Sequence, residues 1–427
     1  MDNVIEVLQA RGFIEQITGE ELKERCKKPI RLYLGIDPTA DSLHLGNLMG
    51  LVALAWFQKL GHNPYALVGG ATGRIGDPSG KSKERPILDD ATLKHNVQSL
   101  EKSLHKMLRF SEGNRAVIVN NDDWLGPFSL IQFLRDVGKQ FRVGQMLAKE
   151  SVRSRIQSEE GMSFTEFSYQ VLQGYDFYHL HKTEKVCLQI GGSDQWGNIT
   201  AGIELNRKMG EEPVYGMIWP LLTRSDGKKF GKSEGGAIWL SADKLSPYEF
   251  YQYLFRIPDA DVIRMLRLLT FVDLEEILEI EADMQKKSYV PNTAQKRLAA
   301  EVTRFVHGDE GVEAAEKVSR GVGFGSDAKL SAKVLKQLAA DMPNMTLPSH
   351  DVLGQKFVDL ACKVGLIPSK AEAVRLIKNG GAYFNNERVV DPAFVFGKEH
   401  LIEGEYLLLS VGKKKRILIT IHPMEKF

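Results

Sequence analysis

Residues 30–47 read IRLYLGIDPTADSLHLGN and pass from a short apolar run into a helical pattern. Ile30–Ile36 has the length and the branched and aromatic content of a buried strand. From Leu43 to Leu60 apolar residues recur three and four positions apart, which predicts a helix soon after the strand. Strands that alternate with helices are typical of α/β proteins, whose ligands bind beyond the carboxyl ends of parallel strands. We therefore expect the loop that begins at Asp37 to face a site.

The same alternation continues through the first two-thirds of the chain. Further strands are expected at Tyr65–Gly69, Ala116–Asn120 and Lys185–Ile190, and further helices at Leu93–Leu108, Leu130–Phe141 and Phe164–Tyr178. Together these segments predict an α/β domain with a doubly wound parallel sheet (Rossmann-like) over residues 1–245.

The remaining third shows three other patterns. Helical periodicity without strand signals predicts an α-helical domain over residues 246–325, and a mixture of Gly, Ser, Pro, Met and Lys predicts a linker at residues 326–350. Residues 351–427 contain helical patterns at Val352–Val364 and Lys370–Lys378, followed by strand-like runs. This last stretch is expected to form a small α+β domain.

The charge of the whole chain gives no sign of a nucleic-acid partner, because 56 Lys and Arg balance 55 Asp and Glu. Residues 351–427 differ slightly, with 12 basic and 9 acidic residues and a net charge of 12 − 9 = +3. Four of these cations form the run Lys413–Arg416. A charge run is usually a solvated face, so charge alone leaves RNA contact as one of two alternatives.

The cysteines and the amino terminus bear on the compartment. Cys26, Cys187 and Cys362 lie far apart, without the spacing of a zinc site or a disulfide framework, which favours a reducing intracellular environment. Met1–Glu6 has no basic or apolar signal region, and no apolar stretch approaches the roughly 20 residues that span a bilayer. We expect a cytoplasmic protein without a membrane segment.

Two segments have residues suited to phosphate. His44 and Asn47 are three apart at a helix start, where backbone N–H groups and the helix dipole favour anions, and Gly46 would let a purine approach. Residues 226–233, DGKKFGKS, place three lysines in a glycine-bearing loop that can close over a leaving pyrophosphate. Each segment has an ordinary alternative, a helix cap for the histidine and a solvated loop for the lysines.

A third segment points to a polar ligand. Tyr169, Gln173 and Asp176 are spaced four and three on one face of an otherwise apolar helical pattern. Buried polar groups are costly unless they meet a polar ligand or one another, so a binding site and an internal hydrogen-bond network both remain open.

Residues 76–82, GDPSGKS, look like a phosphate-binding P-loop but do not fit its spacing. The motif requires four residues between its glycines, and only three separate Gly76 from Gly80. Ile75 occupies the required position. Any phosphate there is expected to be held by loop cations.

Taken together, the first two segments resemble the paired signatures of class I aminoacyl-tRNA synthetases. His44–Asn47 (HLGN) is similar to the HIGH motif, and Lys229–Ser233 (KFGKS) is similar to the KMSKS motif. Their order, their separation and the strand before the first agree with that family. Asn47 departs from the second histidine of HIGH, although its amide can still donate to a ribose oxygen.

Longer matches narrow the resemblance to bacterial-type tyrosyl-tRNA synthetases and cover essentially the whole chain. They are SYQVLQGYD at 168–176, GGSDQWGNIT at 191–200, GGATG at 69–73, GDPSG at 76–80, and Tyr33 before GIDPT at 35–39.

The resemblance implies a role for each matching residue. For tyrosine, the phenolic hydroxyl would be held by Tyr33 and Asp176, the α-ammonium by Asp77, Tyr169 and Gln173 with support from Gln189, and the carboxylate by Gln195. ATP would be bound by Asp37, Gly46, Asn47, Gly192, Asp194 and Lys232. The catalytic residues, which act on the phosphates, would be Thr39, His44, Lys81, Arg85, Lys229 and Lys232.

The resemblance also implies the substrates and the partners of the protein. The substrates would be L-tyrosine, ATP with Mg²⁺ and tRNA(Tyr), without a metal held by the protein. The chain would form a homodimer through the segment Asp123–Gln145, inserted in the catalytic domain. Residues 246–325 would lie on the anticodon side, and residues 351–427 would bind RNA.

Three rival functions are weighed against this one. A tryptophanyl-tRNA synthetase has similar signatures, but Tyr33 and Asp176 suit a phenol rather than an indole. A synthetase-derived RNA-binding factor without activation chemistry would not need His44, Lys229 and Lys232 intact. A nucleotidyltransferase with one HxGH-like motif would not explain the expected tyrosine pocket or the RNA-binding tail.

Overall fold

The computed structural model describes residues 3–81, 83–111, 113–223, 225, 227, 230–233, 236–321, 330–339, 342–412 and 415–422. The chain forms two compact units, one of residues 1–245 with 253–307, and one of residues 246–252 with 308–427. No helix in the described part of the chain is both long and apolar enough to cross a membrane.

The first unit is built on a six-stranded sheet with the order β1-β6-β5-β2-β3-β4. All neighbouring strands are parallel except the edge strand β1, which pairs antiparallel with β6. The strands are β1 (Gln16–Ile17), β2 (Arg31–Ile36), β3 (Asn63–Val68), β4 (Val117–Asn120), β5 (Val186–Gly192) and β6 (Tyr215–Trp219). The chain runs outward from β2 to β4 and then returns to the other side of β2, so the predicted doubly wound sheet is confirmed.

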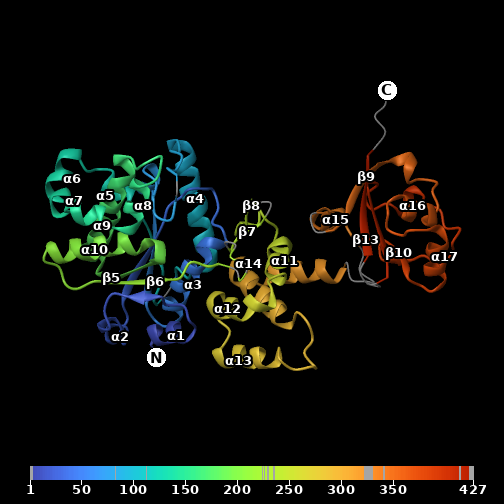
Figure 1. The fold of residues 1–427 in the computed structure, drawn as a ribbon, viewed down its shortest axis with the longest axis horizontal. Helices are drawn as coiled ribbons and strands as arrows, with labels where there is room; N and C mark the ends of the chain where they lie inside the picture. Colours follow the sequence, from blue (N-terminus) through green and yellow to red (C-terminus); the bar gives the residue numbers. More distant parts are fainter. Residues whose placement is uncertain are drawn as a thin grey trace. The chain divides into compact units, whose positions relative to one another are not determined.

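Helices cover both faces of this sheet. In Figure 1, α9 (Phe164–Glu184) and α10 (Trp196–Lys208) lie on one side of the strands, and α3 (Leu45–Lys59) and α4 (Asp90–Met107) lie on the other. Side-chain caps fix where they begin, because Asp89 accepts from the Thr92 amide ahead of α4 and Ser163 accepts from the Glu166 amide ahead of α9. The smaller helices are α1 (Val4–Ala10), α2 (Glu21–Arg25), α5 (Asp122–Leu125), α6 (Leu130–Asp136), α7 (Val143–Leu147) and α8 (Glu150–Ile156).

Most expected segments in this unit have the expected type, with shifted ends. The helix expected at Leu130–Phe141 is divided into α6 and a 3₁₀ turn at Gly138–Gln140, and the helix expected to end at Tyr178 continues to Glu184. Strands β1 and β6 were not expected.

The helical stretch that follows consists of α11 (Pro247–Phe255), α12 (Asp259–Leu269), α13 (Leu274–Asp283) and α14 (Thr293–Gly321). Helices α12 and α13 belong to the first unit, and α14 has a kink at Gly308, whose φ is 71°. A positive φ suits glycine because it has no β-carbon. The four-part division into residues 1–245, 246–325, 326–350 and 351–427 stays a prediction.

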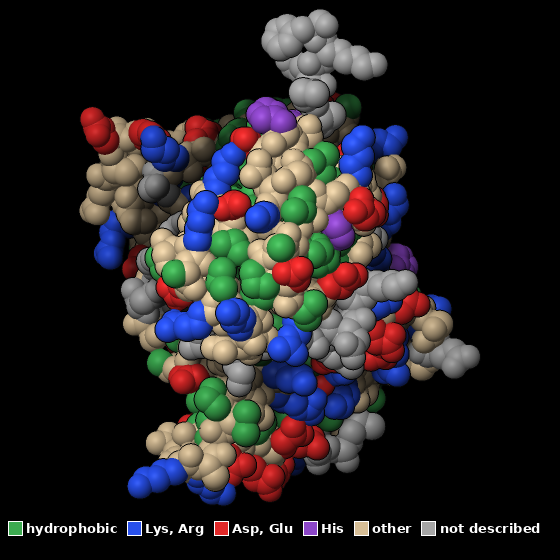
Figure 2. All heavy atoms as spheres, turned by 90° about the vertical axis from the view of Figure 1, so that its right-hand side faces the viewer, with side chains coloured by type: hydrophobic (Ala, Val, Ile, Leu, Met, Phe, Trp, Pro, Cys, Tyr) green, Lys and Arg blue, Asp and Glu red, His purple; other side chains and the backbone are tan. Residues whose placement is uncertain are grey.

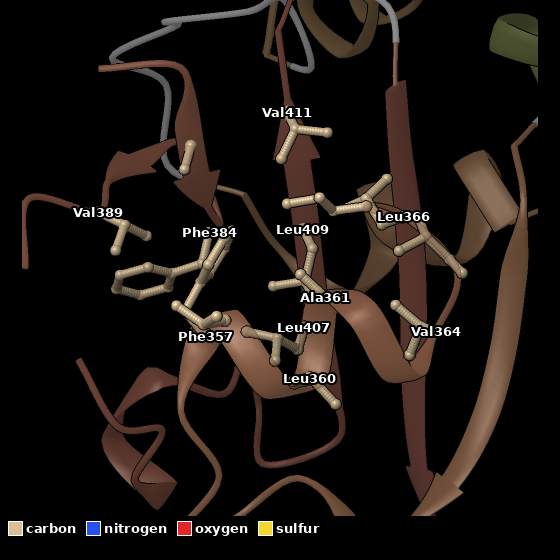
Figure 3. Close-up of a cluster of buried hydrophobic side chains, with 14 of the residues drawn as sticks. Phe357, Leu360, Ala361, Val364, Leu366, Phe384, Val389, Leu407, Leu409 and Val411 are labelled. Atoms are coloured by element: carbon tan, nitrogen blue, oxygen red, sulfur yellow. The ribbon is translucent and has the colours of Figure 1, made fainter. Parts of the chain in front are cut away.

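The second unit contains a five-stranded sheet with the order β11-β10-β12-β13-β9. Its strands are β9 (Asn344–Pro348), β10 (Ala382–Phe384), β11 (Glu387–Arg388), β12 (Tyr406–Val411) and β13 (Lys415–His422), and its helices include α15 (Ala332–Ala339), α16 (Phe357–Lys363) and α17 (Lys370–Lys378). Figure 3 shows Phe357, Leu360 and Ala361 of α16 gathered with side chains of β10 and β12 into one buried cluster. The expected small α+β domain is therefore confirmed as a fold.

Candidate active site

A cavity of about 440 Å³ opens at the carboxyl ends of β2 and β5. These two strands are neighbours at the point where the strand order reverses, which is where doubly wound sheets bind ligands. Of the predicted site residues, the cavity is lined by Tyr33, Asp37, Thr39, His44, Gly46, Asn47, Asp77, Lys81, Arg85, Tyr169, Gln173, Asp176, Gln189, Gly192, Asp194 and Gln195. The fold thus brings together predicted site residues from four separate stretches of the chain, 33–47, 77–85, 169–176 and 189–195.

Two buried polar atoms in the cavity wall have no hydrogen-bond partner among the described residues. They are the hydroxyl of Tyr33 in β2 and the side-chain oxygen of Gln189 in β5, which are paired across the two strands. Unsatisfied buried polar atoms are rare in proteins because each costs desolvation free energy. Their presence at the same end of the cavity indicates that this end receives a polar ligand group.

The carboxylate of Asp176 lies in the same wall and is only 2% exposed. The indole nitrogen of Trp124 donates to one of its oxygens at 2.8 Å, and the side-chain amide of Asn121 donates to the other at 3.0 Å. Burial raises the pKa of Asp176 to about 7, while the Asn121 and Trp124 hydrogen bonds oppose that rise. The two donors orient the carboxylate. Sequence reasoning missed them, although both follow the predicted strand Ala116–Asn120, at the sheet edge where a site was expected.

A second buried carboxylate, Asp37, is engaged with two neighbouring side chains. The Tyr169 hydroxyl donates to Asp37 at 2.7 Å, and the Thr72 hydroxyl donates to its other oxygen at 2.8 Å. Burial raises the pKa of Asp37 to about 6, and the hydrogen bond from Tyr169 opposes part of that rise. Asp37 was expected at ATP and Tyr169 at tyrosine, and the structure places the two in direct contact.

Hydrogen bonds between amide side chains and Asp77 connect another part of the cavity wall. Gln195 donates to Asp77 at 2.7 Å, and Gln173 donates to the side-chain oxygen of Gln195 at 3.3 Å. The buried amide of Asn198 donates to Gln173 at 2.9 Å. Burial also raises the pKa of Asp194. Three residues expected to bind tyrosine therefore form one network, to which Asn198 adds a contact that sequence reasoning did not foresee.

His44 and Asn47 both cap α3 and line the cavity. The Nδ1 atom of His44 accepts from the Gly46 amide at 3.0 Å, and the side-chain oxygen of Asn47 accepts from the His44 amide at 3.0 Å. The helix cap that was the ordinary alternative for His44 is thus present. It holds the imidazole ring at the N-terminus of α3, where anions are favoured. Asn47 supplies the oxygen acceptor that closes the cap.

The described part of the lysine segment lies against the start of α3. A β-carbon on Gly231 would lie 3.1 Å from the Leu45 β-carbon and 3.3 Å from the Gly46 nitrogen, so the two backbones approach closely. The Leu45 amide also donates to the Ile238 carbonyl at 2.8 Å. The two signature segments therefore meet. Lys229 lies outside the described residues, and of Lys232 only the backbone is described, in the hairpin β7 (Lys232–Ser233) and β8 (Gly236–Ala237).

Among the described residues, no group of three or more His, Cys, Asp or Glu side chains could hold a metal ion. Positive charge at the cavity comes instead from the side chains of Lys81 and Arg85, which line it. The Arg85 guanidinium donates to the Asp77 carbonyl at 3.0 Å.

Comparison with known proteins agrees with this geometry. Residues 24–322 match the family model of tRNA synthetases class I (W and Y), and residues 334–419 match that of the Tyrosine--tRNA ligase SYY-like C-terminal domain. A tyrosine--tRNA ligase of Protochlamydia amoebophila is 54% identical over 422 residues, which is 99% of both chains. A chloroplastic/mitochondrial tyrosine--tRNA ligase of Arabidopsis thaliana is 52% identical over 98% of this chain and 84% of that one. The truncated mitochondrial tyrosyl-tRNA synthetase of Aspergillus nidulans superposes with a TM-score of 0.67 at 32% identity, over 75% of this chain and 94% of that one.

Proposed function

Because the chain belongs to the tyrosine--tRNA ligases, within the class I family of tryptophan and tyrosine synthetases, we propose which of its residues carry each step of that reaction. The enzyme activates L-tyrosine with ATP to tyrosyl-adenylate plus pyrophosphate, then transfers tyrosine to the 3′-terminal adenosine of tRNA(Tyr). The rival assignments to tryptophan, to RNA binding alone and to another nucleotidyltransferase are set aside by the 54% identity over the full chain.

Tyr33 and Asp176 hold the phenolic hydroxyl in our proposal. The supporting observation is the unpartnered Tyr33 hydroxyl beside a carboxylate that Trp124 and Asn121 already orient. A phenol donates one hydrogen bond to a carboxylate and accepts one from a hydroxyl, so both protein groups are satisfied when tyrosine binds. This pair is the single observation on which the assignment depends.

The ammonium and carboxylate groups of tyrosine bind beside the hydrogen-bonded side chains of Asp77, Gln173 and Gln195 in our proposal. Asp77, Tyr169 and Gln173 bind the α-ammonium, Gln189 supports the pocket wall, and Gln195 orients the carboxylate. Support comes from the charge of Asp77 and from the hydrogen bonds that tie Gln173 and Gln195 together. Fixed partners hold the substrate carboxylate in position for in-line attack on the α-phosphorus of ATP.

ATP lies at the other end of the cavity in our proposal. Asp37, Gly46, Asn47, Gly192 and Asp194 bind its adenosine part, with Lys232. Thr39, His44, Lys81, Arg85, Lys229 and Lys232 stabilise the charge that develops on the departing pyrophosphate. The close approach of Gly231 to Gly46 supports this division, because it brings the lysine segment to the helix start that carries His44. Mg²⁺ arrives with ATP and neutralises phosphate charge.

The carboxyl-terminal unit contacts tRNA in our proposal. Lys363 and Lys370 are already in ion pairs with Asp351 and Asp359, whereas Lys356, Arg375 and Lys378 form none with the described acidic residues. On the face shown in Figure 2, basic side chains are interspersed with acidic and hydrophobic ones. Lys356, Arg375 and Lys378 are therefore the candidates on or beside α16 and α17 for contact with RNA phosphates. Lys413 and Lys414 lie outside the described residues.

A homodimer formed through Asp123–Gln145 is also proposed. Leu130, Ile131 and Leu134 of α6 are exposed, as is Val143 at the start of α7. Exposed large apolar residues that cluster on one segment favour a protein interface.

A cytoplasmic location is proposed on the free state of the three cysteines, because thiols persist in reducing compartments. Fractionation of the source cells tests it.

One assay tests the site assignment. ATP–pyrophosphate exchange is measured with tyrosine, phenylalanine and tryptophan for the wild type and for Tyr33→Phe. Tyrosine should support exchange far better than phenylalanine, and the Tyr33→Phe variant should narrow that difference. An unchanged ratio would remove Tyr33 from the hydroxyl contact.

A further inference from the structure

The buried carboxylate of Asp261 is bonded to the residue just before the lysine segment. Asp261 lies in the first turn of α12 and is 3% exposed. Its two oxygens accept from the backbone amide of Ser225 at 3.0 and 3.2 Å, and one accepts from the Ser225 hydroxyl at 3.0 Å. Hydrogen bonds to a charged acceptor are among the stronger ones in proteins, so this contact fixes the position of Ser225.

A second contact from the same helix fixes the approach to Ser225. One turn after Asp261, the guanidinium of Arg264 donates to the carbonyl of Thr223 at 3.3 Å. Thr223 and Ser225 therefore both contact the beginning of α12. Between Lys229 and Lys232, the Gly231 amide donates to the Tyr253 hydroxyl at 3.0 Å.

Helix α12 is itself held firmly in the first unit. Val262, Met265, Leu266 and Leu269 are fully buried, and α12 packs against α3, the helix that starts at His44. At its other end, the guanidinium of Arg11 donates to four carbonyls, those of Leu266, Arg267, Thr270 and Val272, at 2.7 to 3.2 Å. The same guanidinium lies 4.9 Å from the Trp56 ring of α3. Asp261 thus lies on a helix that is packed against α3.

We propose that Asp261 is a positioning residue for adenylate formation. It acts through Ser225 and sets where the segment carrying Lys229 and Lys232 begins, relative to the His44 end of α3. This inference rests on the proposed function, in which those lysines stabilise the departing pyrophosphate. Asp261 touches no substrate, so it changes the rate of the chemical step and leaves tyrosine affinity alone.

The variants differ in how much of the contact they keep. In Asp261→Asn the side-chain oxygen still accepts from the Ser225 amide, and the new amide donates to the Ser225 hydroxyl. Asp261→Ala removes all three bonds, and because Ser225 is exposed, water can satisfy it. The matched control is Glu279→Gln, which removes one negative charge from an exposed position on α13.

The test uses the full-length enzyme in ATP–pyrophosphate exchange. We expect Asp261→Ala to lower kcat by about ten- to a hundredfold, because small misplacements of catalytic groups cost this much. The KM for tyrosine should change less than about twofold, Asp261→Asn should fall between Ala and wild type, and Glu279→Gln should match wild type. A raised KM with kcat intact, or an Asn variant as impaired as Ala with an equally lowered melting temperature, would overturn the inference in favour of a purely structural role.

A double-mutant cycle separates this inference from the proposed function. If Asp261 acts through the lysine segment, the loss caused by Asp261→Ala should shrink to less than about threefold in the Lys232→Ala background. Equal losses in both backgrounds would overturn the inference. Lys232→Ala without any loss of kcat would overturn the proposed role of the lysine itself, and loss with Lys232→Ala but none with Asp261→Ala would overturn the role of Asp261 alone.

Discussion

The indole nitrogen of Trp124 donates a 2.8 Å hydrogen bond to Asp176 from α5, the short helix that follows the edge strand β4. Asn121 donates to the second oxygen of the same carboxylate. The remaining acceptor capacity of Asp176 is left for a ligand, beside the unpartnered Tyr33 hydroxyl. This arrangement supports recognition of a phenol and leads to the first prediction.

Replacing Asp176 should sharply impair tyrosine activation. Asp176→Ala removes the charged acceptor of the phenol, and such a hydrogen bond is worth about ten- to two-hundredfold in kcat/KM. Trp124→Phe keeps the carboxylate but removes the donor that orients it, so this variant should lose less kcat/KM than Asp176→Ala. Pyrophosphate exchange measures both, and equal activity of wild type and Asp176→Ala would refute the contact.

The unliganded enzyme should become less stable as the pH rises from about 4 to 7. The folded-state pKa of Asp176 is raised to about 7 and that of Asp37 to about 6. Because the folded state holds these protons more tightly than the unfolded state, their contribution is fully present below the unfolded pKa and is lost as pH rises through the folded values. Asp176→Asn should flatten the dependence. Thermal melts at pH 5 and pH 8 measure this dependence, with Asp243→Asn, at an exposed position outside the proposed dimer segment, as the control.

Lysine replacement should separate catalysis from tyrosine binding. Lys232→Ala and Lys229→Ala are each expected to lower kcat for pyrophosphate exchange by about a hundredfold, as for the loss of one group that stabilises developing charge. The KM for tyrosine should change little. Lys102→Ala, on the exposed face of α4, is the control. A main effect on tyrosine affinity would mean that the segment does not act on the phosphates.

Removing residues 322–427, which are most of the second unit, should leave activation intact and impair tRNA charging. The structure places β9, at Asn344–Pro348, in the sheet of that unit, so a chain ending at Gly321 is a cleaner truncation than one ending at Ser349. Phosphate contacts weaken with salt, so charging by the full-length enzyme should be more salt-sensitive than pyrophosphate exchange. Unchanged charging by the truncated chain would exclude a tRNA role, and a thermal melt shows whether the remainder stays folded.

A charge in the exposed apolar segment should disrupt the proposed homodimer. Ile131 is 73% exposed, and Ile131→Glu would bury a charge if two chains meet there. Sedimentation analysis should show a dimer for the wild type and mostly monomer for the variant. The matched change Ile87→Glu, at a residue 74% exposed outside this segment, should leave the dimer in place. A wild-type monomer would end the proposal.

The sequence predicted the elements whose pattern is local. Ile30–Ile36 and Leu43–Leu60 carry their own periodicity, and the strand and helix lie there within two residues. Strand β1 has only two residues and β6 contains a glycine, so neither has a periodicity that could be read. Their positions depend on pairing with segments far along the chain.

Site residues with a family motif were found, while those that support them were not. Asn121 and Asn198 contact Asp176 and Gln173, which are 55 and 25 residues away in sequence. Asp37 accepts a hydrogen bond from Tyr169, which is 132 residues away in sequence, and neither motif by itself predicts this contact. Side-chain pairs of this kind form only when distant segments meet in the folded chain, so no spacing rule in the sequence predicts them.

Arg11 also has a consequence for how the chain is made. Its carbonyl partner Val272 lies 261 residues downstream, so at the usual pace of synthesis Arg11 is added to the chain about 10 to 50 seconds before Val272. Every residue lining the cavity, from Tyr33 to Ala237, is translated within that interval. A nascent chain can therefore contain every residue of the pocket before α12 has been made, and at that stage Arg11 has none of its four carbonyl partners.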